Sequence, residues 1–168
     1  MNKQEIYQLL INEQIHYEVT EHEAVYSMAD LSKVDLPHPN AEAKNLFVRD
    51  DKKQHFYLIT VSGDKRVNLK DFRKRHGMRP LSFATKEDLQ SLLELEPGAV
   101  TPLGLLNDTD CQVEFYLDES FMTTSGIIGI HPNENTATLW LKAQDLLAIL
   151  QKHGRRLASC TQLQSHCI

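Results

Sequence analysis

The sequence predicts a single domain of the mixed α/β class. Patterns typical of helices alternate along the chain with patterns typical of strands. Two β-rich runs flank the polar stretch DDKKQ between residues 44 and 62, which is typical of a β-hairpin. With 168 residues, 41% of them apolar and 24% charged, the chain is long enough for one core of ordinary size. We assign this domain to residues 1–154.

The first part of the chain supplies a helix, a strand, a short helix and the hairpin. Apolar residues at helical spacing predict a helix over 2–13, and alternation predicts a strand over 16–22. A short helix over 28–34 is expected next, with Ser27 or Asp30 as its cap. Prolines then indicate a loop before the hairpin.

The second part of the chain continues the alternation. Asn68 caps a predicted helix that Gly77 ends, and Thr85 with Asp88 resembles a capping box for a helix through Leu95. The remaining predicted elements are strands over 111–120 and 137–143 and a closing helix over 143–154. Because no periodicity follows, residues 155–168 are assigned to a C-terminal tail of unknown order.

Several classes of protein are excluded by what the sequence lacks. The N-terminal stretch MNKQEIYQLLINEQ is amphipathic rather than a signal peptide, and no apolar run approaches membrane-spanning length, so we expect a cytoplasmic protein that does not enter a membrane. Cys111, Cys160 and Cys167 fit neither a disulfide framework nor a zinc site. Neither HExxH nor CxxC is present, and GxSxG, P-loop and GxGxxG motifs are also lacking, so no metal or cofactor is predicted.

Basic residues are concentrated in one segment of an acidic chain. The net charge is −5, yet residues 65–79 contain seven Lys or Arg against Asp71 alone, a local charge of +6 by subtraction. On a helix, Lys70, Arg73 and Lys74 share one face at i, i+3 and i+4. This face is either an ordinary solvated surface or a contact for the phosphates of tRNA.

The stretch PGAVTP, residues 97–102, combines two prolines with small side chains. One interpretation is a turn that ends the preceding helix. The other is a loop whose unhindered backbone N–H groups face a ligand oxyanion, since glycine and small residues permit close approach.

Lys44 and His131 are candidate site residues, and each also has an ordinary structural interpretation. Lys44, followed by Asn45, begins a strand-like run, where a lysine either protects a sheet edge or binds an anion. His131 follows a glycine-rich approach and precedes a proline, which suits either a turn or a site residue.

Taken in order, the KN pair, the GxxxP stretch and the glycine-flanked histidine resemble the prolyl-tRNA synthetase editing-domain superfamily (YbaK/ProX, INS-like). Within this superfamily, the chain most resembles the free-standing bacterial branch, the Ala-tRNA(Pro) deacylases. The matching stretches are EHEAVYSM, AKNLFVRDDKKQHFYLITV, LSFATKEDLQSLLELEPGAVTPLGLLND and GIHPNENTATLWL. They span most of residues 15–153, and LEPGAVTPLGL and HPNENTATLWL are the most specific of them.

The resemblance implies a curved, partly barrel-like sheet surrounded by helices, and hydrolysis of alanine wrongly attached to tRNA(Pro). It further implies that no side-chain nucleophile takes part: the GxxxP backbone positions the aminoacyl group and the water, and the terminal hydroxyl of the substrate assists. Carried over, the catalytic residues are Lys44, Gly98, Pro102 and His131. The substrate-binding residues are Asn45, Ala99, Val100, Thr101 and Gly129.

Two alternatives remain open. One is a deacylase for another small aminoacyl group, cysteine or serine, since specificity depends on pocket volume. The other is a non-catalytic tRNA-binding module that acts with prolyl-tRNA synthetase as its partner. Retention of Lys44, the whole GxxxP stretch and His131 argues against this second alternative.

Overall fold

The computed structural model describes residues 1–154. The elements in chain order are α1 (Lys3–Asn12), β1 (Tyr17–Glu21), α2 (Met28–Leu31), β2 (Ala43–Asp50), β3 (Phe56–Ser62), α3 (Leu69–Arg75), β4 (Leu81–Phe83), α4 (Lys86–Leu93), the 3-10 helix η1 (Pro102–Leu106), β5 (Val113–Leu117), α5 (Ser120–Thr123), β6 (Ile127–Ile130), β7 (Ala137–Lys142) and α6 (Ala143–Lys152). The mixed α/β class predicted from the sequence is confirmed. The predicted C-terminal tail, with Cys160 and Cys167, lies outside the described residues.

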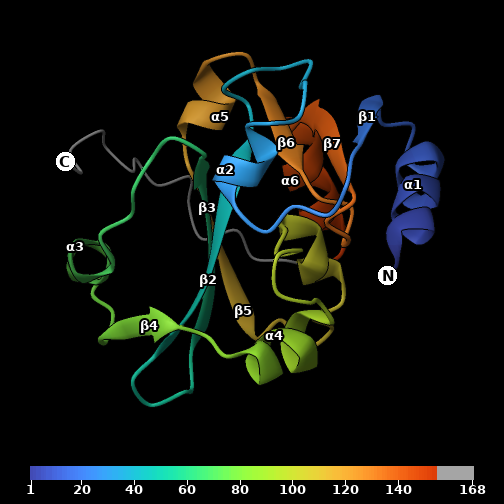
Figure 1. The fold of residues 1–168 in the computed structure, drawn as a ribbon. Coiled ribbons are helices and arrows are strands. Elements are labelled where there is room, and N and C mark those ends of the chain that lie inside the picture. Colours follow the sequence, from blue (N-terminus) through green and yellow to red (C-terminus); the bar gives the residue numbers. More distant parts are fainter. Residues whose placement is uncertain (155–168) are drawn as a thin grey trace.

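The strands of the described chain form two sheets. A three-stranded sheet has the order β1-β7-β6, and a four-stranded sheet has the order β4-β2-β3-β5 (Figure 1). Neighbouring strands are antiparallel except β3 and β5, which run parallel. The sheets meet where the start of β2 approaches β6: Glu42 and Gly129 form a bridge, and Gly129 N donates to Ala41 O at 2.7 Å. This bridge and hydrogen bond connect the two sheets.

The predicted hairpin is confirmed by the pairing of β2 with β3, in which Ala43 lies opposite Ser62 and Arg49 opposite Phe56. Its turn is stabilised by a buried carboxylate, because Asp50 accepts hydrogen bonds from Gln54 N at 2.8 Å and from the ring of His55 at 2.8 Å. A satisfied buried carboxylate at the turn fixes the register of both strands.

Helix caps predicted from the sequence are mostly in place. Ser27 caps α2, Asn68 caps α3, and Thr85 with Asp88 forms a capping box for α4. Two predicted helices were too long: α2 stops at Leu31 and α4 at Leu93. In α4 the reason is that Glu94 adopts a left-handed conformation with φ 53°, which ends the helix before the proline and glycine do.

Four short elements were not predicted: β4, η1, α5 and β6. Strand β6 (IIGI) is buried along most of its length, so its sequence lacks the alternation by which a half-buried strand is recognised. The others span only three to five residues each, too short for a period to show.

Apolar side chains form a large and a small cluster. The large one fills the space enclosed by the two sheets, α1, α4, η1 and α6 (Figure 1), and contains Leu58, Leu103, Phe115 and Leu139. The small one lies on the other face of the four-stranded sheet, where Phe72 of α3 covers Val61 and Tyr116. Among residues 1–154, no helix has the length and apolar character needed to cross a membrane.

Candidate active site

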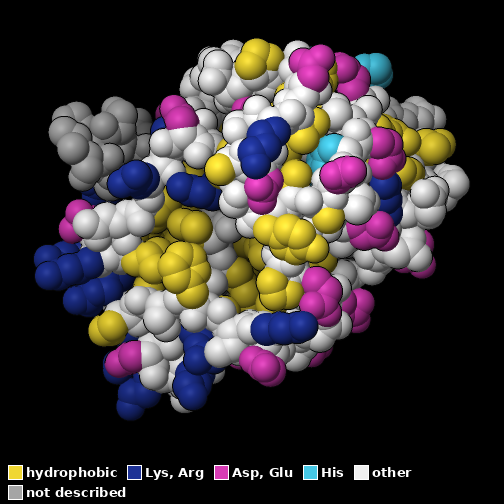
Figure 2. Space-filling model, viewed as in Figure 1, with side chains coloured by type: hydrophobic (Ala, Val, Ile, Leu, Met, Phe, Trp, Pro, Cys, Tyr) yellow, Lys and Arg dark blue, Asp and Glu magenta, His cyan; other side chains and the backbone are white. Residues whose placement is uncertain are grey.

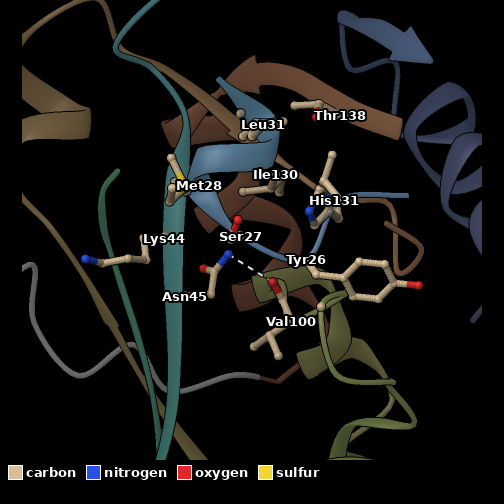
Figure 3. A pocket seen from close by; sticks show the side chains of 14 residues that line it. Tyr26, Ser27, Met28, Leu31, Lys44, Asn45, Val100, Ile130, His131 and Thr138 are labelled. Atoms are coloured by element: carbon tan, nitrogen blue, oxygen red, sulfur yellow. Dashed lines mark hydrogen bonds between the residues drawn. The ribbon is translucent and has the colours of Figure 1, made fainter. Parts of the chain in front are cut away.

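A cavity of about 300 Å³ opens between the two sheets near their junction (Figure 3). Its lining comes from the segment leading into α2, the start of β2, the PGAVTP loop, and the adjoining parts of β6 and β7. The lining residues are Val25, Tyr26, Ser27, Met28, Leu31, Ala43, Lys44, Asn45, Gly98, Val100, Gly129, Ile130, His131 and Thr138. The tertiary structure thus brings the three sequence-predicted features, KN, GxxxP and His131, to one cavity.

The PGAVTP loop needs glycine at position 98, the first residue of GxxxP. Gly98 has φ +88°, a conformation that side chains rarely adopt. A Cβ at this position would also lie 2.9 Å from Cδ1 of Tyr26, so the tyrosine ring packs directly on the loop backbone. Both the dihedral angle and the packing therefore exclude larger residues.

The loop presents unpaired backbone donors. Within residues 1–154, the N–H groups of Gly98, Val100 and Thr101 donate to no protein acceptor, whereas Ala99 N donates to Glu96 O at 3.0 Å. The end of the loop is rigid, because Thr101 is buried and caps η1, with buried Pro102 as its first residue. Fixed N–H groups beside a cavity are suited to stabilising negative charge on a ligand oxygen.

Asn45 connects the loop to the four-stranded sheet. Its Nδ2 donates to Val100 O at 3.0 Å, and its Oδ1 accepts from the hydroxyl of Thr60 at 2.6 Å. Asn45 also lines the cavity, so its predicted contact with substrate stays a prediction, and its amide in addition holds the loop against β2. Asn45 thus links the loop, β2 and β3.

Lys44 lies on the opposite face of β2 from Asn45, because successive side chains of a strand alternate. It is paired with Val61 of the small apolar cluster, and its Nζ donates to the carbonyl of Lys65. Figure 3 shows its side chain directed away from His131 and Val100. The ammonium group therefore sits at the rim of the cavity, where it can contact a group outside but not one at the loop.

His131 follows β6 and lines the cavity opposite Asn45. Its Nδ1 donates to the carbonyl of Ala137 at 2.8 Å. Burial lowers the pKa of His131 below the usual value; the hydrogen bond to Ala137 opposes this shift and the neighbouring His22 adds to it. The ring is accordingly neutral at pH 7, with Nε2 as a hydrogen-bond acceptor.

Gly129 has a structural reason to be glycine. A Cβ there would lie 2.4 Å from the indole ring of Trp140, so the close packing of β6 on β7 requires it. Gly129 also lines the cavity, and its predicted contact with substrate stays a prediction.

Eight of the fourteen lining residues were not singled out as site residues from the sequence, and four of these eight carry a hydroxyl group or sulfur. Tyr26 and Ser27 lie within the stretch EHEAVYSM, and Thr138 lies within HPNENTATLWL. Met28 completes this group. Their sequence signal was proximity to the motifs, since serine, threonine and tyrosine are too common to be recognised alone.

The predicted tRNA-binding residues lie away from the cavity, on α3. Lys70 and Lys74 are exposed and Arg73 is half-buried. Helix α3 covers the same face of the four-stranded sheet to which Lys44 points. Figure 2 shows Lys and Arg side chains gathered on the side that carries α3, and Asp and Glu side chains more numerous on the side that carries α1.

The fold and the site define an enzyme class. Within the described chain, unpaired backbone N–H groups of Gly98 and Val100 lie beside a small cavity, an arrangement suited to an oxyanion. Such a site is typical of hydrolases that cleave an activated acyl group by positioning it for water.

Comparison with known proteins identifies the family: the chain belongs to the aminoacyl-tRNA editing domain family, whose model matches residues 22–149. It is an aminoacyl-tRNA deacylase of the ProX type, a hydrolase.

Individual relatives agree with this assignment. The chain is 36% identical to the prolyl-tRNA editing protein ProX of Acetoanaerobium sticklandii over 90% of this chain and 92% of that protein. It is 34% identical to the prolyl-tRNA synthetase associated domain-containing protein 1 of Mus musculus, over 83% and 84% of the two chains. A crystal structure of a proposed trans-editing enzyme for prolyl-tRNA synthetase shares the fold, with a TM-score of 0.65 at 23% identity, covering 94% of this chain and 95% of that one.

Proposed function

We propose that this deacylase removes alanine from mischarged tRNA(Pro), acting in trans on the free aminoacyl-tRNA. The observation that carries the proposal is the PGAVTP loop, in which Gly98 and Val100 have N–H groups unpaired within residues 1–154 and line a cavity of about 300 Å³. The name of the Acetoanaerobium sticklandii relative supports the prolyl-tRNA assignment.

The proposed reaction needs no side-chain nucleophile, because an aminoacyl ester is already activated. Water adds to the ester carbonyl, and negative charge develops on the carbonyl oxygen, where the N–H groups of Gly98 and Val100 stabilise it. The terminal hydroxyl of the tRNA orients the water. The C–O bond to the ribose then breaks, and the leaving oxygen takes the proton that the water loses.

The remaining site residues hold the substrate in this proposal. His131 fixes the aminoacyl group inside the cavity, and Asn45 keeps the loop in place through Val100. Lys44, at the rim, binds the phosphate of the terminal nucleotide after exchanging its present contact with the carbonyl of Lys65. The basic face of α3 contacts the tRNA further out.

The test is a comparison of tRNA(Pro) charged with alanine, glycine, serine, cysteine or proline. We expect alanine to be released fastest, glycine and serine more slowly, and proline most slowly. A small pocket excludes the prolyl ring sterically. It discriminates between alanine and glycine only through one methyl group, which changes the rate about 10–200-fold. Release of proline as fast as alanine would refute editing, since the enzyme would destroy the correct product. Fastest release of cysteine or serine would instead assign the site to those groups.

Replacement of Lys44 tests the rim contact. Lys44→Ala should lower kcat/KM for alanyl-tRNA(Pro) about 10-fold or more, as expected for loss of a charge-assisted contact. Thermal unfolding should change little, because this ammonium group binds only a carbonyl in the free protein. The exposed Lys142 is the matched control, and Lys142→Ala should retain the full rate. Equal rates for wild type and Lys44→Ala would remove Lys44 from the site.

Neutralising the basic face of α3 tests the tRNA contact. Arg73→Gln with Lys74→Gln should raise the tRNA concentration needed for half-maximal rate and flatten its dependence on salt, because fewer counterions are released on binding. Hydrolysis of a minimal aminoacyl-nucleotide should stay nearly constant, since α3 lies on the other face of the sheet from the loop. Equal losses on tRNA and on the minimal substrate would show that the helix acts through the fold instead.

A further inference from the structure

Two histidine rings, those of His131 and His22, lie near one wall of the cavity, and their hydrogen bonds show which ring nitrogen carries a proton. The Nδ1 atom of His131 lies 2.8 Å from Ala137 O, and the Nδ1 atom of His22 lies 2.8 Å from Glu23 O. A backbone carbonyl can only accept, so each neutral ring carries its proton on Nδ1. In the neutral form of either ring, Nε2 is then an acceptor.

The hydroxyl of Thr138 is oriented by this arrangement. Its Oγ1 lies 2.9 Å from Nε2 of His22, and when this ring is neutral Nε2 can only accept, so the hydroxyl donates its proton there. Thr138 is 2% exposed and lines the same cavity as His131. With its proton engaged, Oγ1 can offer only lone pairs to a ligand.

We propose that Nε2 of His131 and Oγ1 of Thr138 bind the α-ammonium group of the aminoacyl substrate, with His22 as the positioning residue that orients the Thr138 hydroxyl. A wall with two acceptors is matched by a group that only donates. In an aminoacyl ester the protonated amino group is the one such group, since the ribose hydroxyls also accept and the ester oxygens accept only. The inference rests on the proposed hydrolysis of alanyl-tRNA and deepens it.

The test replaces the ammonium group without changing the size of the substrate. In lactyl-tRNA(Pro) a hydroxyl stands where alanyl-tRNA(Pro) carries the ammonium group. Each enzymatic rate is divided by the spontaneous hydrolysis rate of the same ester, because the ammonium group activates the ester by itself. We expect the rate enhancement for the alanyl ester to exceed that for the lactyl ester about 10–100-fold, as for hydrogen bonds to a charged group.

Variants at Thr138 and His22 test whether these residues cause the preference for the alanyl ester. Thr138→Val should reduce the preference for alanyl over lactyl ester about 10-fold, mainly by slowing alanyl hydrolysis, whereas Thr138→Ser should keep most of it. His22→Phe should also reduce the preference, because the hydroxyl of Thr138 would then be free to donate toward the substrate. Thr109→Val, at an exposed threonine, is the control and should leave both rates unchanged.

The possible outcomes distinguish failure of the ammonium site from failure of the proposed deacylase function. Equal rate enhancements for both esters in the wild type would overturn the ammonium site while leaving deacylation intact. A proportional loss on both esters in Thr138→Val, with Thr138→Ser equally impaired, would assign Thr138 to packing and overturn it as well. Absence of hydrolysis of either ester by the wild type would refute the proposed function itself.

Discussion

Gly98→Ala should reduce kcat/KM for alanyl-tRNA(Pro) by about 10²–10³-fold, the cost typical of losing one well-placed oxyanion donor. The added methyl group would lie 2.9 Å from Tyr26 and 3.3 Å from the side chain of Asn135, at a backbone angle of φ +88° that alanine disfavours. The loop must therefore shift, and its N–H groups shift with it. Single-turnover deacylation measures the chemical step directly.

Gly126→Ala is the matched control for this change. Gly126 also has positive φ, +72°, but a Cβ there would meet no heavy atom within 4 Å, and the residue does not line the cavity. Both variants should lose about 1–2 kcal/mol of folding stability from the left-handed conformation, yet only Gly98→Ala should lose activity. Similar activity in the two variants would show that the loop backbone does not take part in catalysis.

Asn45→Asp should reduce the deacylation rate about 100-fold while leaving the shape of the side chain unchanged. The carboxylate can still accept from the hydroxyl of Thr60, but it cannot donate to Val100 O and would face that carbonyl with a negative charge. An unsatisfied carbonyl and a repelling oxygen together cost about 1–3 kcal/mol or more, so the loop should move away from β2. The added negative charge also opposes an oxyanion nearby.

Thr60→Val distinguishes loop positioning from a general loss of packing at this strand. It removes the 2.6 Å hydrogen bond to Asn45 Oδ1 but keeps the bond to Val100, so its activity should fall far less than that of Asn45→Asp. Hydrogen exchange at Ala99 and Val100 reports loop motion independently of activity. Full activity in Asn45→Asp would show that the contact with Val100 is not needed for catalysis.

Local sequence determined much of the secondary structure. The hairpin followed from two β-rich runs around a polar turn, and the caps at Asn68 and Thr85 followed from residue types that bind nearby N–H groups. The residues of the cavity could also be nominated, because KN, GxxxP and His131 are recognisable as an ordered set. The hairpin and the caps depend on neighbours within a few positions, whereas the site residues came from the resemblance of the whole ordered set to a known family.

Only the tertiary structure decided which way these residues face and what they contact. The alternation of β2 turns Asn45 toward the PGAVTP loop and Lys44 toward the opposite face, so adjacent residues of one motif have different environments. Thr138 and His22 are 116 positions apart and meet only because β1 pairs with β7. Contacts of this kind depend on strand register and sheet closure, which no local pattern specifies.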